Sequence, residues 1–310
     1  MKNQIFVALS SFAEHDKCPL ELLKASGYPY KIHNTGKRIT SSELLCNAYD
    51  AEVILAGVES YDAKALEKLP NLRCISRCGV GIDSIDIQAA KQRGIEVLNT
   101  PGIPTQAVAE LALTMFLALS RNLPRQIDSM RDRKWERLET HLLSGKIVGL
   151  IGLGSIGQRV AELCNAFGAK VIAFDPLVAA GIAEKINVSL VSKEQLLAAA
   201  DIVSLHASKG PDKACLIAAG ELNLMKCGAY LVNLARGEMV NELALVDALS
   251  SGKLAGAGLD VFGEEPYKGP LCDFKQVILT PHSATNTIET RSNMELMCVQ
   301  NAIQFLQNTM

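Results

Sequence analysis

Residues 146–176 read KIVGLIGLGSIGQRVAELCNAFGAKVIAFDP, and this stretch decides the fold of the chain. Its first part, 147–151, is almost wholly apolar, which is typical of a parallel strand buried on both faces. Apolar side chains then recur at helical spacing over 156–167, which predicts a helix that Gly168 ends. A second apolar run, 170–174, predicts another buried strand. The order strand, turn, helix, strand indicates a parallel α/β unit.

Three glycines in the turn, Gly152, Gly154 and Gly157, have the spacing G-x-G-x-x-G. In a dinucleotide site the first glycine lets the chain turn, the second lets a pyrophosphate approach the backbone, and the third lets the helix pack on the strand. Ser155 and Ile156 would open the helix and present free N–H groups to the phosphates. The alternative is a tight turn without a ligand, which the glycine spacing alone leaves open. Agreement between strand, turn and helix favours the dinucleotide site.

An acidic residue follows the second strand of this stretch. Asp175 stands where a carboxylate accepts hydrogen bonds from ribose hydroxyls in dinucleotide-binding units. Its charge would repel a 2′-phosphate, and no arginine follows closely to bind one. The predicted cofactor is therefore NAD and not NADP.

The bulk properties exclude several classes of protein. A chain of 310 residues is long enough for two domains, and a net charge of −2 gives no electrostatic reason to expect nucleic acid or an anionic membrane. No apolar run has the length of a membrane span or of a signal sequence, so we expect a cytoplasmic protein. Nine cysteines without a C-x-x-C pair favour reduced thiols over disulfides or a metal site.

Two breaks in the pattern predict the domain organisation. Residues 1–100 alternate short apolar runs with helical patterns but contain no phosphate-binding motif, which predicts a second α/β domain. A break rich in proline and glycine leads into residues 101–284, the predicted cofactor domain, which opens with a long amphipathic helix. The final stretch, 285–310, reads as one helix that packs back on the first domain.

The segment 121–143 is polar and charged, and it contains the only tryptophan, Trp135. It is either a surface arm or a contact with a partner, and the tryptophan favours the partner.

Polar residues follow several strands of the predicted cofactor domain. Arg236 follows one strand, Asp260 and Glu265 another, and His282 the last, so all of them should lie on the rim of the glycine turn. Hydride transfer to a carbonyl needs such a proton donor and often a cation for an acidic substrate.

Six strands are predicted after Ser144: 147–151, 170–174, 201–206, 229–233, 257–260 and 277–279.

Motifs around these residues resemble one family. NLARG, LDVF-x-x-EP and PH-x-A, behind G-L-G-x-I-G and a strand-end Asp, resemble the D-isomer-specific 2-hydroxyacid dehydrogenases, and RCGVGID, NTPG, VAELALTM and KWER also match. The resemblance covers nearly the whole chain. It implies two doubly wound parallel-sheet domains, a Rossmann cofactor domain inserted in a flavodoxin-like substrate domain. It also implies a homodimer formed through the long helix and the segment with Trp135.

The resemblance also implies roles for the rim residues. Arg236 would bind the carboxylate and keto oxygen of a small 2-keto acid, and His282 would be the general acid/base. Glu265 would bond the far nitrogen of His282, and Asp260 would orient the nicotinamide carboxamide. Ala235 belongs to the same implied cofactor site.

Further positions of the family pattern lie outside this group. Backbone groups of Val80 and Gly81 would bind the substrate carboxylate, and Arg77 remains available for a substrate phosphate. His206 would line the cofactor pocket, although the usual H-x-P has become 206–208, His-Ala-Ser.

One departure leaves the substrate open. Phosphoglycerate dehydrogenases commonly carry an arginine for the phosphate where this chain has Ala56 and Gly57. The candidate substrates are phosphoglycerate, hydroxypyruvate, glyoxylate and a larger 2-keto acid. We do not expect the regulatory domain that some phosphoglycerate dehydrogenases append. An NAD-sensing corepressor of the same family is the alternative to an enzyme.

Overall fold

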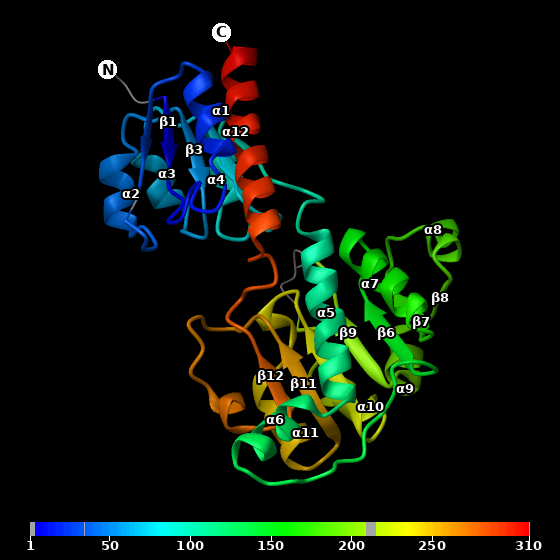
Figure 1. Cartoon of the computed structure of the whole chain (residues 1–310). Helices are drawn as coiled ribbons and strands as arrows, with labels where there is room; N and C mark the ends of the chain where they lie inside the picture. The colour runs from blue at the N-terminus through cyan, green and yellow to red at the C-terminus, as the bar shows by residue number, and fades with distance from the viewer. Residues whose placement is uncertain (1–3, 34, 209–214, 310) are drawn as a thin grey trace. The chain divides into compact units, whose positions relative to one another are not determined.

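The computed structural model describes residues 4–33, 35–208 and 215–309, and the chain divides into two compact units (Figure 1). Unit 1 comprises Met1–Pro104 and Asn286–Met310, and unit 2 comprises Thr105–Thr285. Unit 2 is therefore an insertion between two segments of unit 1.

Unit 1 contains a five-stranded parallel sheet in the order β2-β1-β3-β4-β5. This is the flavodoxin-like doubly wound order. Its strands are β1 (Ile5–Val7), β2 (Tyr30–Ile32), β3 (Val53–Ala56), β4 (Cys74–Arg77) and β5 (Glu96–Leu98).

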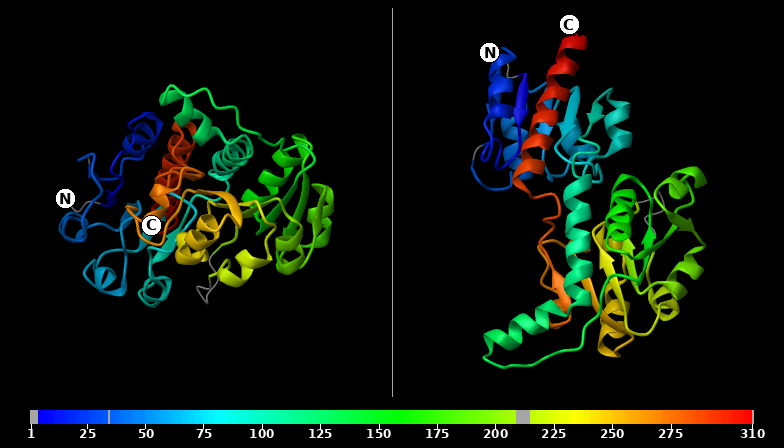
Figure 2. Two further views of the ribbon diagram at one scale, coloured as in Figure 1. Left: turned by 90° about the horizontal axis from the view of Figure 1, so that it is seen from below. Right: turned by 45° about the vertical axis from the view of Figure 1, so that its right-hand side comes forward.

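Helices cover both faces of the unit 1 sheet, as Figure 1 and Figure 2 show. On β1, Ile5 packs with the cluster of α1 and α12, whereas Phe6 packs with the cluster of α2, α3 and α4. Side chains of Thr40, Asp62 and Asp86 cap α2, α3 and α4, which fixes where these short helices begin. The helices are α1 (Cys18–Ala25), α2 (Ser41–Asn47), α3 (Ala63–Glu67), α4 (Ile87–Gln92) and α12 (Ile288–Thr309).

Unit 2 contains a seven-stranded parallel sheet in the order β12-β11-β10-β9-β6-β7-β8. From β8 to β11 this is the Rossmann order, so the prediction of two doubly wound domains is confirmed. Its strands are β6 (Ile147–Ile151), β7 (Lys170–Phe174), β8 (Val188–Leu190), β9 (Ile202–Leu205), β10 (Ala229–Asn233), β11 (Leu254–Leu259) and β12 (Val277–Leu279).

The predicted number of six strands in this unit was wrong, because β8 was missed. β8 has three residues, and two of them, Ser189 and Leu190, are exposed at the edge of the sheet. Such a strand has neither the length nor the continuous apolar pattern that identified its neighbours.

The helices of unit 2 also form two layers. α5 and α7 pack on one face of the sheet, and α9, α10 and α11 pack on the other. Figure 2 shows α6 and the segment after it projecting from the sheet, and Trp135 there is 76% exposed. The helices are α5 (Thr105–Ser120), α6 (Leu123–Arg131), α7 (Ser155–Ala166), α8 (Ala180–Lys185), α9 (Lys193–Ala199), α10 (Ala219–Leu224) and α11 (Glu242–Ser250).

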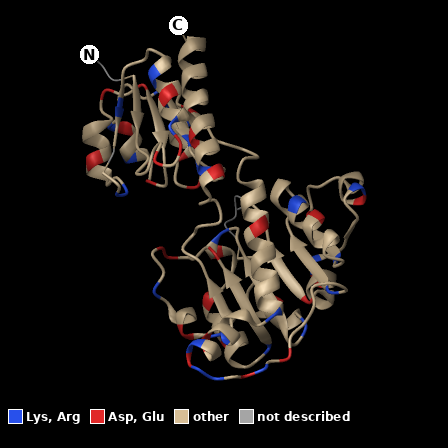
Figure 3. Cartoon of the chain, in the orientation of Figure 1, with Lys and Arg blue, Asp and Glu red and all other residues tan. Residues whose placement is uncertain are grey.

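Charges of both signs are interspersed over both units in the view of Figure 3. This distribution agrees with the small net charge of −2. Among the described residues, no helix combines the length and the apolar character that crossing a membrane requires.

Candidate active site

The carboxyl ends of the parallel strands in unit 2 share one edge of the sheet, where ligands of open α/β sheets bind. Each of six strands, β6, β7, β9, β10, β11 and β12, is followed there by a residue that the sequence analysis assigns to the site. The predicted residues in the turns, in the loops and in the first turn of α7 at this edge are Gly152, Gly154, Ser155, Ile156, Gly157, Asp175, His206, Ala235, Arg236, Asp260, Glu265 and His282. The three predicted substrate residues Arg77, Val80 and Gly81 belong to unit 1.

The three glycines of the turn after β6 differ in their surroundings. Gly152 has φ +98°, and a Cβ on it would lie 2.5 Å from the backbone nitrogen of Ala207. A Cβ on Gly157 would lie 2.3 Å from the carbonyl oxygen of Gly152, so this glycine lets α7 pack on the turn. A Cβ on Gly154 would meet no heavy atom within 4 Å. The backbone at Gly154 is therefore open to a ligand, as a pyrophosphate requires.

The start of α7 fits the same group. Gly154 is the N-cap residue, and no side chain caps the helix. The first N–H groups of a helix have no partner within it, so Ser155 and Ile156 present donors at the positive end of the helix dipole. These residues fit the pyrophosphate of a dinucleotide.

Asp175 links the glycine turn to the loop after β7. Its carboxylate accepts hydrogen bonds from the backbone N–H groups of Leu153 at 2.7 Å, Leu177 at 2.8 Å and Val178 at 3.2 Å. A carboxylate has about four acceptor positions, so one position is left for a ribose hydroxyl.

His206 lies beside the glycine turn, with its Cβ 3.7 Å from the position of a Cβ on Gly157. Burial lowers the pKa of its imidazole to about 4, so the ring is neutral at physiological pH. Its Nε2 lies 2.9 Å from the hydroxyl of Ser204, and its buried Nδ1 has no partner within the described part of the chain. A neutral imidazole carries one ring proton, so His206 has one hydrogen-bond donor and one acceptor.

Glu265 and His282 form a pair at the same edge. Oε2 of Glu265 lies 2.9 Å from Nδ1 of His282, and Oε1 accepts a hydrogen bond of 3.1 Å from the N–H of Phe262. The carboxylate favours the tautomer with the proton on Nδ1 and fixes the orientation of the ring. Half of the His282 side chain is exposed, so Nε2 can exchange a proton with a ligand.

Asp260 holds the loop that carries His282. It is 1% exposed, and it accepts hydrogen bonds from the hydroxyl of Thr280 at 2.6 Å and from the N–H groups of Ser283 at 2.8 Å and Ala284 at 3.0 Å. The bonds flank His282 on both sides, and His282 itself has the unusual φ of +50°. Sequence reasoning missed this anchoring contact, because nothing in the spacing indicates which groups Asp260 bonds.

The turn that carries Arg236 is shaped by two residues that sequence reasoning also missed. The buried amide of Asn233 accepts a hydrogen bond from the N–H of Ala235 at 3.0 Å and donates one to the carbonyl of Arg236 at 2.8 Å. A Cβ on Gly237 would lie 1.9 Å from the carbonyl carbon of Phe262. The Arg236 turn therefore packs directly on the loop that carries Glu265.

Of the predicted substrate residues of unit 1, Arg77 is the last residue of β4, and Val80 and Gly81 lie in the loop after it. Arg77 donates a hydrogen bond from Nη1 to the carbonyl of Cys78. The next residues are held by the hydroxyl of Thr100, which accepts from the N–H of Gly79 at 2.9 Å, and by the amide of Asn99, which donates to the carbonyl of Val80 at 2.8 Å. This loop lies at the carboxyl edge of its own sheet.

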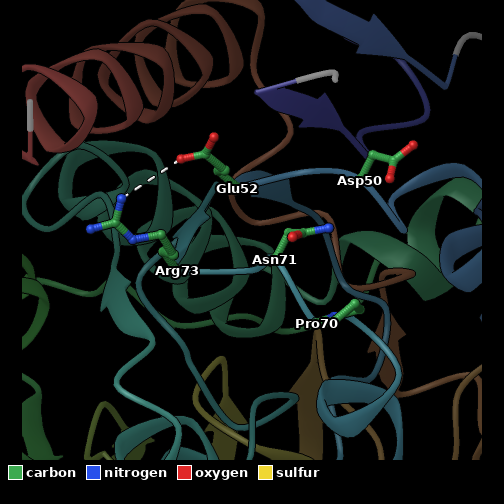
Figure 4. A pocket seen from close by; sticks show the side chains of 5 residues that line it. All are labelled: Asp50, Glu52, Pro70, Asn71 and Arg73. Atoms are coloured by element: carbon green, nitrogen blue, oxygen red, sulfur yellow. Dashed lines mark ion pairs between the residues drawn. The ribbon is translucent and has the colours of Figure 1, made fainter. Parts of the chain in front are cut away.

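A pocket at the other edge of the unit 1 sheet contains none of these residues (Figure 4). Arg73 and Glu52 in it form an ion pair of 3.7 Å, with both side chains partly exposed. Because it lies where β3 and β4 begin, it is not where parallel sheets bind ligands. Its lining residues are Asp50, Glu52, Pro70, Asn71 and Arg73.

No three His, Cys, Asp or Glu side chains of the described ranges are grouped so that they could hold a metal ion. All nine cysteines are free thiols, and four of them, Cys74, Cys78, Cys164 and Cys298, are buried.

Comparisons with known proteins agree with this geometry. The family model described as "D-isomer specific 2-hydroxyacid dehydrogenase, NAD binding domain" matches residues 113–284. A D-3-phosphoglycerate dehydrogenase of Archaeoglobus fulgidus is 39% identical over 82% of this chain and 49% of its own length. The chain thus spans about half the length of the phosphoglycerate dehydrogenases that it matches.

Two further proteins are similar over almost their whole length. A glyoxylate reductase of Aeropyrum pernix is 36% identical over 98% of this chain and 93% of its own. The crystal structure of the TT0316 protein from Thermus thermophilus superposes with a TM-score of 0.89 and 33% identity over 98% of this chain and 97% of its own. The family model and these relatives confirm the predicted resemblance: the chain belongs to the D-isomer specific 2-hydroxyacid dehydrogenase family and contains its NAD-binding domain.

Proposed function

We propose that this protein is an NAD-dependent oxidoreductase that interconverts a D-2-hydroxy acid and its 2-keto acid. The observation that carries the proposal is the 2.9 Å pair of Glu265 and His282 at the sheet edge that also holds the dinucleotide turn. A polarised histidine beside a nicotinamide site is what reduction of a carbonyl requires.

NADH, held at Gly154, Ser155 and Asp175, would supply a hydride to C2 of the keto acid, and the protein would supply the proton. His282, protonated on both nitrogens, donates the Nε2 proton to the keto oxygen while Glu265 holds Nδ1. Arg236 binds the substrate carboxylate through two parallel hydrogen bonds, which the planar guanidinium allows. Asp260 keeps His282 in place through the loop on both sides of it.

Three residues of unit 1 also take part in the proposed binding of the substrate. The backbone N–H groups of Val80 and Gly81 bind the substrate carboxylate, and Arg77 contributes positive charge. Two observations support this role. Thr100 and Asn99 hold the loop through the N–H of Gly79 and the carbonyl of Val80, and not through the N–H groups of Val80 and Gly81. The loop also lies at the carboxyl edge of the unit 1 sheet, where ligands of parallel sheets bind. A cytoplasmic location, expected from the sequence, belongs to the same proposal.

The test is to mix the protein with NADH and each member of a panel of 2-keto acids, and to measure oxidation of NADH by its loss of absorbance. The panel includes glyoxylate, pyruvate, hydroxypyruvate, its 3-phosphate ester and a branched keto acid. Turnover of at least one of them is expected. Tight NADH binding without turnover of any member would contradict the proposal and is what the corepressor alternative predicts; no observation in the structure favours that alternative.

Glu265→Gln is expected to lower kcat for keto-acid reduction by about tenfold or more, the usual cost of losing a carboxylate that orients a histidine. Glutamine has nearly the shape of glutamate but carries no negative charge, so His282 loses the anionic partner at Nδ1. The measurement is kcat at saturating NADH and keto acid. An unchanged kcat would show that Glu265 does not act on His282.

Asp175→Ala is expected to narrow the preference for NADH over NADPH by about tenfold, the equivalent of about 1.4 kcal/mol of lost repulsion and ribose bonding. The measurement is kcat/KM with each cofactor. Asp175→Asn separates the two causes, because it removes the charge that repels a 2′-phosphate but keeps an acceptor for the N–H of Leu153 or Leu177. Equal use of both cofactors by the unmodified protein would contradict the prediction.

We further propose a homodimer formed through α5, α6 and the segment that follows. Apolar side chains are exposed along this region, as in dimer interfaces. They are Leu123, Ile127, Met130, Trp135 and Leu142. Sedimentation at micromolar concentration should give the mass of two chains, and Trp135→Glu should lower it toward that of one. A monomer in the unmodified protein would refute the proposed assembly.

A further inference from the structure

The loop between β3 and α3 in unit 1 contains a buried acid. Glu59 is 5% exposed, and its Oε1 accepts hydrogen bonds from the N–H of Gly57 at 2.7 Å and from the hydroxyl of Tyr61 at 2.6 Å. Within the described residues no donor bonds its Oε2. Oε1 of Glu59 therefore accepts the hydrogen bonds of its own loop, and Oε2 remains available as an acceptor for a ligand.

A cation lies at the end of the neighbouring strand. β3 and β4 pair so that Ala56 is opposite Arg77. The guanidinium of Arg77 forms no ion pair with any described acid, and its buried Nε has no hydrogen-bond partner. The acid Glu59, just after β3, and the cation Arg77, at the end of β4, thus follow from adjacent strands without forming an ion pair with each other.

Both charges act on the same buried groups. Burial raises the pKa of the Tyr61 hydroxyl well above its ordinary value; Glu59 raises it further, and Arg77 lowers it. Burial also raises the pKa of the Cys78 thiol to about 11, with opposite contributions from Arg77 and Glu59. The negative charge of Glu59 therefore offsets the field of Arg77 at this edge of the sheet.

We propose that Glu59 determines which 2-keto acids the protein reduces. The inference rests on the proposed function and specifies its substrate class: keto acids whose C3 substituent is neutral and can donate a hydrogen bond, such as a hydroxymethyl group. The spare oxygen of Glu59 accepts that hydrogen bond, and its charge repels a phosphate or carboxylate in the same place. Ala56 and Gly57 contribute no cation, and the nearby guanidinium of Arg38 is bonded to the carbonyl of Val58.

Hydroxypyruvate and its 3-phosphate ester are the matched probes, because they differ only in the phosphate. We expect kcat/KM of the unmodified protein to be higher for hydroxypyruvate by about tenfold or more. Glu59→Gln keeps an acceptor for Gly57 and Tyr61 but removes the charge, so the ratio should fall by about tenfold or more. Glu67→Gln is the control, since it removes the same charge from an exposed side chain of α3 and should leave the ratio unchanged.

The outcomes separate the inference from the proposed function. If neither probe nor any other keto acid is reduced, the proposed function fails, and the inference fails with it. If hydroxypyruvate is reduced but the ester is reduced equally well or better, only the inference fails. A ratio in Glu59→Gln within about twofold of the unmodified value also overturns it. Should Glu59→Gln not fold, Glu59→Thr provides a second neutral variant, and the same ratio decides.

Discussion

His282→Ala is expected to lower the turnover number for keto-acid reduction by about 10²- to 10⁴-fold, the usual contribution of a positioned general acid. Alanine removes the Nε2 that would give a proton to the keto oxygen. Cofactor binding should change little, because the glycine turn and Asp175 do not contact His282 in the hydrogen bonds described above. The measurements are kcat with the best keto acid of the panel and the dissociation constant of NADH by fluorescence.

The matched control for this variant is His141→Ala. His141 is exposed in the same unit, and only its backbone N–H makes a described hydrogen bond, to the carbonyl of Ser120. Added imidazole should restore part of the activity of His282→Ala, since it can enter the space and donate a proton. Near-normal turnover in His282→Ala would show that another group is the acid.

Most of the fold could be predicted because long apolar strands and a glycine turn are local signals. The run 147–151, the turn at Gly152 and the helix after it identify β6 and α7 from sequence alone. The elements that were missed lack such signals. α6 begins after Asn122, which has φ +50° and makes no capping bond, and its residues are largely polar.

The candidate site could be predicted as a set of residues but not as a set of contacts. Motifs indicated Arg236, Glu265 and His282 one by one, and their roles stay predictions. The bonds from Asp260 to the loop around His282 join segments more than 20 residues apart. Glu59 was missed for the same reason, because only the folded loop shows that its carboxylate is buried beside the end of β3. Through-space contacts of this kind have no periodicity that a sequence pattern could show.

Gly237→Ala is expected to have the second large effect, a fall in kcat/KM of about 10²-fold, since small misplacements of catalytic groups cost this much. A Cβ there would lie 1.9 Å from the carbonyl carbon of Phe262 and 2.3 Å from the nitrogen of Gly263. These are backbone atoms, so no side-chain rotation relieves the overlap. The turn of Arg236 must then move away from the loop that positions Glu265.

The strain of this overlap should also lower the free energy of unfolding by about 1–3 kcal/mol, as overpacking does. Gly263→Ala is the matched control: it adds the same methyl group to the facing loop, where no heavy atom lies within 4 Å of the new Cβ. Urea unfolding and steady-state kinetics of both variants are the measurements. If kcat/KM of Gly237→Ala matched that of Gly263→Ala, the packing of the two loops would not be what holds Arg236 and Glu265 in register.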